Sequence, residues 1–239
     1  MQDKFSLVVC TYNRTKLTDE FLAHNLSNTG IENPNIELIW IDNGSTDGVE
    51  SIVEKYKPEI FLRRANDCLS KSKNAAYAVC RGDWVIDLEN DFFMPDNWLR
   101  DMMEYAKSIP NTGIMATKVG GWDSLLTLEY NTPITNVNGK DVIITNAIGP
   151  RIFSKELFKT CGFLTENYGF YGAEDFEITG RSAKAGFINY IIPTIMADHR
   201  GIGEWDSGEY REKKNKGLEH PKVGFPEGQI YYNPFVSSK

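Results

Sequence analysis

Two short acidic segments contain residue types that could carry chemistry. In the first, Glu89 and Asp91 stand two positions apart, directly after the apolar run at residues 84–88. Carboxylates at this spacing can point toward one cation, and Mg²⁺ and Mn²⁺ prefer such oxygen ligands. A solvated acidic turn is the alternative interpretation, and the pair alone does not decide between the two.

The second acidic segment is at residues 171–177, where Glu174 and Asp175 open a predicted helix. A helix N-terminus favours an ionised carboxylate, and a general base must be ionised and within reach of a hydroxyl. The glycine and alanine beside Tyr171 would allow a ligand to approach closely. Ordinary helix capping explains the same acids equally well.

Asp42 and His199 are single residues in positions suited to ligand binding. Asp42 follows the apolar run at residues 36–41 and could accept a hydrogen bond from a ribose hydroxyl or a base N–H. The alternative is a plain loop, with Asp47 capping the helix that follows it. His199 stands after a predicted strand, where an imidazole could bind a metal ion, although a lone histidine is more often structural.

Basic residues could neutralise a diphosphate group, although most of them are expected on the solvated surface. The candidates are Lys71, Lys73, Arg151, Arg200, Arg211, Lys213, Lys214 and Lys216. The last three belong to a segment that we interpret as a mobile loop, which could close over bound phosphates.

Apolar runs alternate with helical patterns over the first half of the chain. We predict strands at residues 5–10, 36–41, 60–62, 84–88 and 114–118, and a helix at 96–106 that Asp96 caps. This alternation is typical of βαβ units and a largely parallel sheet, whose ligands bind beyond the carboxyl ends of the strands. The turns at residues 11–14, 42–48 and 89–96 should therefore share one edge of the sheet.

The second half of the chain predicts a smaller mixed region. Strands are expected at 142–145 and 148–153, and helices at 155–159 and 174–185, the latter ended by Gly186. A last strand at 187–192 should stop at Pro193. We expect a single α/β domain over 1–239, with a ligand-binding half at 1–118, a second half at 119–200, and a mobile loop and tail at 201–239.

The composition excludes several classes of protein. The 239 residues are 41% hydrophobic and carry a net charge of −7, which argues against disorder and against a binder of nucleic-acid backbones. No apolar segment is as long as the about 20 residues that a membrane-spanning helix requires, and the N-terminus has no signal-peptide pattern. The four cysteines form no C-x-x-C pair, so we expect reduced thiols in a cytoplasmic protein. Phosphate-binding P-loop, G-x-S-x-G and zinc motifs are absent from the sequence.

Considered together, the motifs resemble those of the GT-A glycosyltransferases, in particular glycosyltransferase family 2. Residues 8–14, 41–47, 70–76 and 88–96 resemble that family's ordered motifs, and residues 162–187 resemble its acceptor region. The resemblance runs from about Phe5 to His199. Residues 171–175 also resemble the W-G-G-E-D segment of β-1,4-galactosyltransferases, in which a methionine and a histidine bind metal. Met196 and His199 have that spacing, but we favour Met196 as a core residue of the strand.

The resemblance implies a GT-A (Rossmann-like) fold and a role for each candidate residue. The nucleotide would be bound by Thr11, Tyr12, Asn13, Arg14, Asp42, Lys73 and Asn90. Mn²⁺ or Mg²⁺ would be held on the diphosphate by Asp91 and His199, with Glu89 contributing directly or through water. Asp175 would deprotonate the acceptor hydroxyl, and Glu174 would position the acceptor. Glu89 and Lys73 depart from the family, which commonly has aspartate and arginine at these places.

We therefore expect a metal-dependent, inverting glycosyltransferase that uses a nucleotide-sugar, with a UDP-sugar favoured, and a glycan, glycolipid or protein acceptor. Three alternatives remain: a nucleotide-sugar-binding protein without transferase activity, a nucleotidyltransferase, and a glycosyltransferase acting on a modified nucleic-acid base. The presence of both Asp91 and Asp175 argues against a protein that only binds nucleotide-sugars. The turn at 11–14 is not the glycine-rich loop of a nucleotidyltransferase, and the net charge disfavours a nucleic-acid acceptor. The sequence identifies neither the sugar nor the acceptor.

Overall fold

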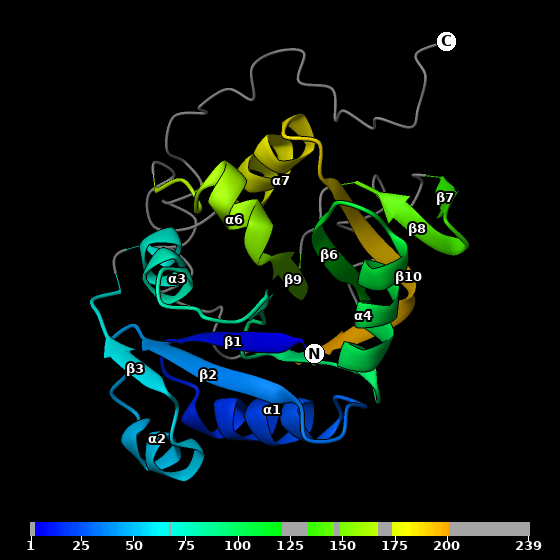
Figure 1. The fold of residues 1–239 in the computed structure, drawn as a ribbon. Coiled ribbons are helices and arrows are strands. Elements are labelled where there is room, and N and C mark those ends of the chain that lie inside the picture. The colour runs from blue at the N-terminus through cyan, green and yellow to red at the C-terminus, as the bar shows by residue number, and fades with distance from the viewer. Residues whose placement is uncertain (1–2, 67, 121–132, 146–148, 167–173, 201–239) are drawn as a thin grey trace.

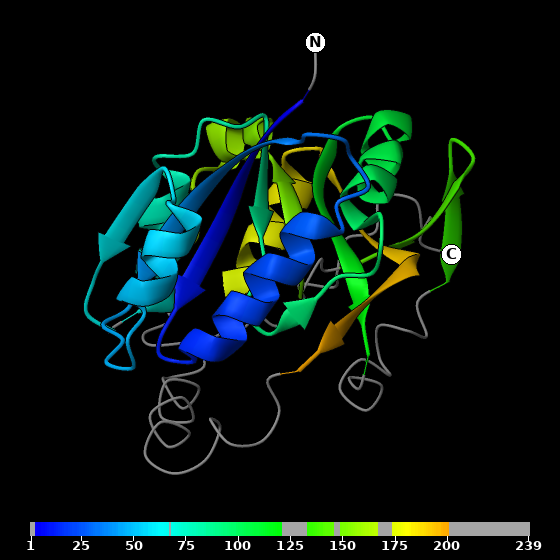
Figure 2. The same cartoon turned by 90° about the horizontal axis from the view of Figure 1, so that it is seen from below.

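A computed structural model describes residues 3–66, 68–120, 133–145, 149–166 and 174–200 of the chain. Within these ranges the protein is an α/β structure in which one mixed sheet is covered by helices on both faces (Figures 1 and 2). No helix of the described ranges combines the length and the apolar character that crossing a membrane requires. The predicted mobile loop and tail at 201–239 lie outside the described residues.

The first part of the chain alternates strands with helices. Its elements are β1 (Lys4–Thr11), α1 (Thr15–Ser27), β2 (Asn35–Asp42), α2 (Glu50–Tyr56), β3 (Ile60–Arg63), α3 (Leu69–Tyr77), β4 (Trp84–Asp87), β5 (Phe92–Phe93), α4 (Trp98–Ser108) and β6 (Thr112–Val119). The second part contains β7 (Ile134–Val137), β8 (Lys140–Ile144), β9 (Arg151–Ser154), α6 (Lys155–Cys161), α7 (Glu174–Lys184) and β10 (Ile188–His199).

The order of strands in the sheet is β3-β2-β1-β4-β9-β6-β10-β8-β7. Strands β3, β2, β1 and β4 are parallel, as predicted, and Thr11 at the end of β1 lies opposite Asp42 at the end of β2. The turns that follow β1, β2 and β4 therefore do share one edge of the sheet. Strand β9 lies antiparallel between β4 and β6, so the sheet is continuous across the two predicted halves of the chain.

Two apolar layers hold the helices on the sheet. Successive side chains of a strand point to opposite faces, so Leu7 and Val9 of β1 belong to one layer and Val8 to the other. Helices α1, α2 and α4 pack on the first face, and α3, α6 and α7 pack on the second. In Figure 1, α1 and α2 lie below strands β1 to β3, and Figure 2 shows α1 crossing its face of the sheet.

Predicted boundaries are wrong at β10 and at α4, and the strand predicted at 148–153 begins only at Arg151. Strand β10 continues past Pro193 to His199, because its register with β6 shifts between Ile192 and Met196, and such an irregularity accommodates a residue that cannot donate to the ladder. Met196 emerges from this irregularity 57% exposed and is not the core residue that we expected. Helix α4 begins at Trp98 without the predicted Asp96 cap, after Asn97 in a left-handed conformation.

Candidate active site

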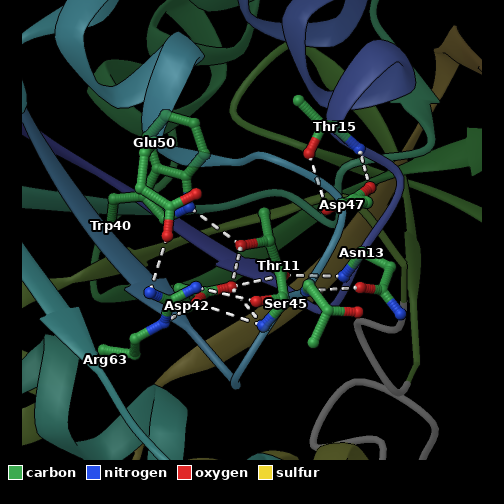
Figure 3. A network of polar contacts seen from close by, with 10 residues as sticks. Thr11, Asn13, Thr15, Trp40, Asp42, Ser45, Asp47, Glu50 and Arg63 are labelled. Carbon is green, nitrogen blue, oxygen red and sulfur yellow. Dashed lines mark hydrogen bonds and ion pairs between the residues drawn. The ribbon is translucent and has the colours of Figure 1, made fainter.

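The turns after β1 and β2 are braced by a buried carboxylate (Figure 3). Asp42 has no exposed surface, and its two oxygens accept hydrogen bonds from the backbone and hydroxyl of Ser45 and from Arg63 Nε at 2.9 Å. Thr11 is also buried: its hydroxyl contacts Asp42 Oδ1 at 3.4 Å and accepts from Trp40 Nε1 at 2.9 Å. Both predicted nucleotide-binding side chains are therefore engaged in shaping the turn.

The turn between β1 and α1 holds two consecutive residues in the left-handed region, Asn13 with φ 56° and Arg14 with φ 63°. Residues other than glycine adopt this region uncommonly, although asparagine does so more often than most. Here Asn13 N donates to Ser45 Oγ at 2.7 Å, and Asn13 Oδ1 accepts from Thr46 N at 2.9 Å. The backbone and the side chain of Asn13 thus both tie this turn to the one after β2.

Asp47 also connects the two turns, and our prediction that it caps its own helix is wrong. Helix α2 has Val49 at its N-cap, whereas the Asp47 carboxylate accepts hydrogen bonds from the backbone N–H and the hydroxyl of Thr15, at 2.7 Å each. Thr15 is the first residue of α1, whose N-cap Arg14 makes no side-chain capping bond. Asp47 supplies a cap from a distant part of the chain because the parallel pairing of β1 and β2 brings both turns together.

Asp91 and His199 come together because β5 pairs antiparallel with the end of β10, with His199 opposite Phe92. His199 Nε2 lies 3.5 Å from Asp91 Oδ2, and Arg14 Nη1 donates to the same oxygen at 2.9 Å. Burial alone would raise the pKa of Asp91, but the hydrogen bond to His199 and the charges of His199 and Arg14 outweigh it and lower this pKa. The site therefore favours an ionised carboxylate.

The donor set fits a divalent cation. Asp91 Oδ1 is buried and has no hydrogen-bond partner among the described residues, so it is available as a metal ligand beside the imidazole. The described ranges contain no group of three or more histidine, cysteine and acidic side chains, so a bound ion would need phosphate oxygens or water to complete its coordination. Glu89, the third predicted ligand, is 42% exposed and forms an ion pair with Lys73 at 3.7 Å.

Asp175 lies at the start of α7 and forms an ion pair with Arg151. Arg151 is 2% exposed and also contacts Asp87 Oδ2, through Nε at 3.1 Å and Nη2 at 2.9 Å. Lys73 is likewise buried, with its ammonium 3.0 Å from the same Asp87 oxygen. These two cations, which were candidates for neutralising a diphosphate, contact carboxylates inside the protein.

Glu174 precedes Asp175 and is 4% exposed. Burial raises the pKa of Glu174 to about 7, and the neighbouring charge of Asp175 acts in the same direction. Near neutral pH this carboxyl group therefore exists in both protonation states, and its protonated form can donate a hydrogen bond.

The remaining predicted nucleotide-binding residues differ in exposure. Tyr12 is 37% exposed at the end of β1, so its ring is accessible to a ligand. Asn90 is 8% exposed and donates to Thr18 Oγ1 at 2.8 Å, which fixes the segment before Asp91 onto α1. Among the basic candidates, Arg200 pairs with Asp198 at 2.7 Å, and Arg211 and residues 213–216 lie outside the described ranges.

Sequence reasoning missed Asp87, although the sequence contains a signal for it. Asp87 stands inside the apolar strand β4 and is 3% exposed. A buried charge is costly without a partner, so an aspartate within such a strand implies a cation packed against it. The identity of that cation, Arg151 on β9, depends on the order of the strands and could not be read from local sequence.

Solved structures of glycosyltransferases share this arrangement of strands and helices. The mannosyltransferase PcManGT from Pyrobaculum calidifontis, in complex with GDP-Man and Mn²⁺, superposes with a TM-score of 0.64 at 19% identity, over 84% of this chain and 57% of that one. TarS 1–349 of S. aureus, in complex with UDP-GlcNAc, gives 0.63 at 20% identity, over 84% of this chain and 60% of that one. The fold is therefore that of the GT-A glycosyltransferases.

Residues 6–162 match the sequence model described as Glycosyl transferase family 2. The chain belongs to glycosyltransferase family 2, as its motifs indicated. A relative in sequence is the poly(ribitol-phosphate) beta-N-acetylglucosaminyltransferase TarS of Staphylococcus aureus (strain Mu50), 29% identical over 103 residues. That match covers 41% of this chain and 18% of TarS, so the chain spans less than a fifth of this relative.

Proposed function

We propose that the protein transfers a sugar from a UDP-sugar to an acceptor hydroxyl, with the help of a divalent cation and with inversion at the sugar. The observation that carries this proposal is the buried Asp91 Oδ1, which has no hydrogen-bond partner within the described ranges and lies beside His199 at the sheet edge where β4 also ends. Glu89 is close enough for its pKa to respond to the charges of both Asp91 and Asp175, which supports one continuous site. The preference for UDP is supported by the solved structure of TarS in complex with UDP-GlcNAc.

On the donor side, Asp91 and His199 would hold Mn²⁺ or Mg²⁺ against the diphosphate. Such an ion acts as a Lewis acid toward the departing nucleotide. Arg14, whose guanidinium already reaches Asp91, would add positive charge beside the same phosphates. Tyr12 would contact the nucleotide through its accessible ring, and the turns braced by Asp42 and Asn13 would fix the shape of that pocket.

On the acceptor side, Asp175 would take the proton from the attacking hydroxyl. Its carboxylate is 28% exposed, so one part of it contacts Arg151 while another remains accessible. Attack from the face opposite the leaving nucleotide gives inversion in a single displacement, for which one general base suffices. Glu174 would position the acceptor by a hydrogen bond, and we favour a glycan, glycolipid or protein as that acceptor.

We place this activity in the cytoplasm, since all four cysteines are free thiols. Cys68 is buried, and Cys10, Cys80 and Cys161 are partly buried.

The test is nucleotide release from a panel of UDP-, GDP- and other nucleotide-sugars, with Mn²⁺, with Mg²⁺ and with EDTA. Slow hydrolysis by water makes an added acceptor unnecessary. Metal-dependent release from a UDP-sugar supports the proposal and identifies the sugar. Binding of UDP without release from any donor would favour a nucleotide-sugar-binding protein, and equal release in EDTA would remove the metal from the mechanism.

A further inference from the structure

We infer that Arg151 is a positioning residue, which holds the Asp175 carboxylate in the active site and is itself fixed by a buried cluster around Asp87. This inference rests on the proposed role of Asp175 as the general base. It concerns how that base is held in place, for which the motifs of the sequence offered no candidate.

The guanidinium of Arg151 divides its donors between two carboxylates. Asp87 and Arg151 are directly opposite each other in the antiparallel pair of β4 and β9. Nε and Nη2 of Arg151 donate to Asp87 Oδ2 at 3.1 and 2.9 Å, which leaves Nη1 to donate to Asp175. Because the guanidinium is planar and rigid, the contact with Asp87 sets the direction in which Nη1 points.

Helix α3 fixes Asp87 from the other side. The same oxygen, Oδ2, accepts hydrogen bonds from Lys73 Nζ at 3.0 Å and from the Tyr77 hydroxyl at 2.9 Å. Burial alone would raise the pKa of Asp87, but the charges of Lys73 and Arg151 outweigh it and lower this pKa to about 2. Asp87 is therefore a permanent anion at neutral pH, held by two secondary structure elements.

The charges of this cluster do not balance internally. Lys73 and Arg151 are each 2% exposed and carry two positive charges, whereas Asp87 supplies one negative charge. Since an unmatched buried charge is unfavourable, the excess of one positive charge attracts one further anion. Asp175 contacts Arg151, while Glu89, whose side chain is 42% exposed, lies 3.7 Å from Lys73. The excess charge thus favours a carboxylate beside Arg151.

The arrangement also explains why Asp175 needs such a contact. Asp175 is the second residue of α7 and therefore lies in the first turn of this helix. A side chain near a helix end has several rotamers available, and a displacement of about 1 Å can lower a rate by about 100-fold. The contact with Arg151 selects one position for the Asp175 carboxylate.

The experiment measures steady-state nucleotide release by the full chain for Arg151→Lys, Asp175→Asn and the double variant. Lysine keeps the charge but cannot contact two carboxylates with the same geometry. We expect R151K to lower kcat on the order of 10- to 100-fold with the donor KM unchanged, and to have no further effect in the D175N background. Arg100→Lys is the matched control, because Arg100 forms an ion pair with Asp101 within α4 and should leave kcat unchanged when replaced.

A purely structural role for Arg151 would give a different result. R151K would then lower activity by the same factor with and without D175N, and this outcome overturns the inference. If R151K is fully active while D175N is inactive, the inference about Arg151 is also overturned, but the proposed function stands. Full activity of D175N would instead remove the proposed base itself. If R151K fails to fold, Tyr77→Phe, which removes one hydrogen bond from Asp87, should lower kcat several-fold, again only when Asp175 is present.

Discussion

Asp47 and Thr15 are joined by two hydrogen bonds of 2.7 Å, so that the turn after β2 caps the helix that follows β1. The donors are the backbone N–H and the hydroxyl of Thr15, and both carboxylate oxygens of Asp47 are used. Together with the bonds of Asn13, this contact makes the two turns one unit at the edge of the sheet.

The first prediction concerns this cap. Asp47→Ala should lower the free energy of unfolding by about 1 kcal/mol, as the loss of a helix cap does, and should weaken donor binding by loosening the turn that carries Arg14. Urea unfolding and calorimetric titration with UDP measure the two effects. Asp198→Ala, which removes a 63% exposed partner of Arg200, should change stability by less than about 0.5 kcal/mol. Equal stability of the two variants would show that the contact with Thr15 has no energetic role.

The second prediction concerns the general base. Asp175→Asn preserves the shape of the side chain but cannot accept a proton, so kcat for nucleotide release should fall about 10²- to 10⁴-fold. Donor affinity, measured by titration with UDP in the presence of Mn²⁺, should stay within about twofold of the wild-type value, because the substitution leaves the proposed donor-binding residues unchanged. A variant that releases nucleotide at the wild-type rate would show that another group takes the proton.

The third prediction concerns the cation. Asp91→Ala removes an oxygen that none of the described residues hydrogen-bonds, so the gain in UDP affinity that Mn²⁺ confers should fall by at least about 10-fold. Asp101→Ala, a partly exposed carboxylate on α4 that pairs with Arg100, is the matched control and should bind like the wild type. If wild-type affinity for UDP is the same with Mn²⁺ and with EDTA, Asp91 does not serve as a ligand.

The fourth prediction concerns the stability of the buried cluster. Asp87→Asn leaves Lys73 and Arg151 without their shared anion, and breaking a buried ion pair in this way costs about 3–5 kcal/mol. The reduction should be visible as a lower midpoint in urea unfolding. Glu156→Gln, which removes an exposed ion pair with Lys159, should stay within about 0.5 kcal/mol of the wild type. A similar loss in both variants would contradict the importance of the buried charges.

The fifth prediction concerns pH. The folded protein keeps a proton on Glu174 up to a pKa of about 7, whereas the unfolded chain releases it near 4.5. Between these values the folded state binds more protons, so stability should fall as pH rises, by up to about 1.4 kcal/mol per pH unit. Glu174→Gln lacks this contribution, so the stability difference between wild type and variant should change across pH 4.5–7 and be constant above it. A constant difference over the whole range would show that Glu174 titrates normally.

The parallel half of the fold could be predicted from sequence because its signals are local. Short apolar runs and helical spacing identify β1, β2 and β4, and parallel pairing then requires their turns to meet, which places Asp42 and Asp91 at one edge. The family resemblance was confirmed for the same reason, since its motifs lie in these turns.

The remaining features depend on contacts between distant residues. Nothing near Asp47 reveals that Thr15 is its partner rather than the following helix. Nothing near Arg151 reveals that β9 pairs with β4, which directs its side chain inward rather than toward a diphosphate. The continuation of strand β10 past Pro193 likewise depends on its register with β6. Such features are properties of the assembled sheet.

The position of β9 also has a consequence for how the sheet forms. Strands β4 and β6 both precede β9 in the chain, yet neither neighbours the other, and β9 fills the place between them. While the chain is being synthesised, β4 therefore has one edge whose backbone groups lack a partner, and β6 has two, because β10 also follows it in the chain. Exposed strand edges promote association between chains. The hydrogen bonding that links β4 to β6 through β9 is formed only after the ribosome has released residues 151–154.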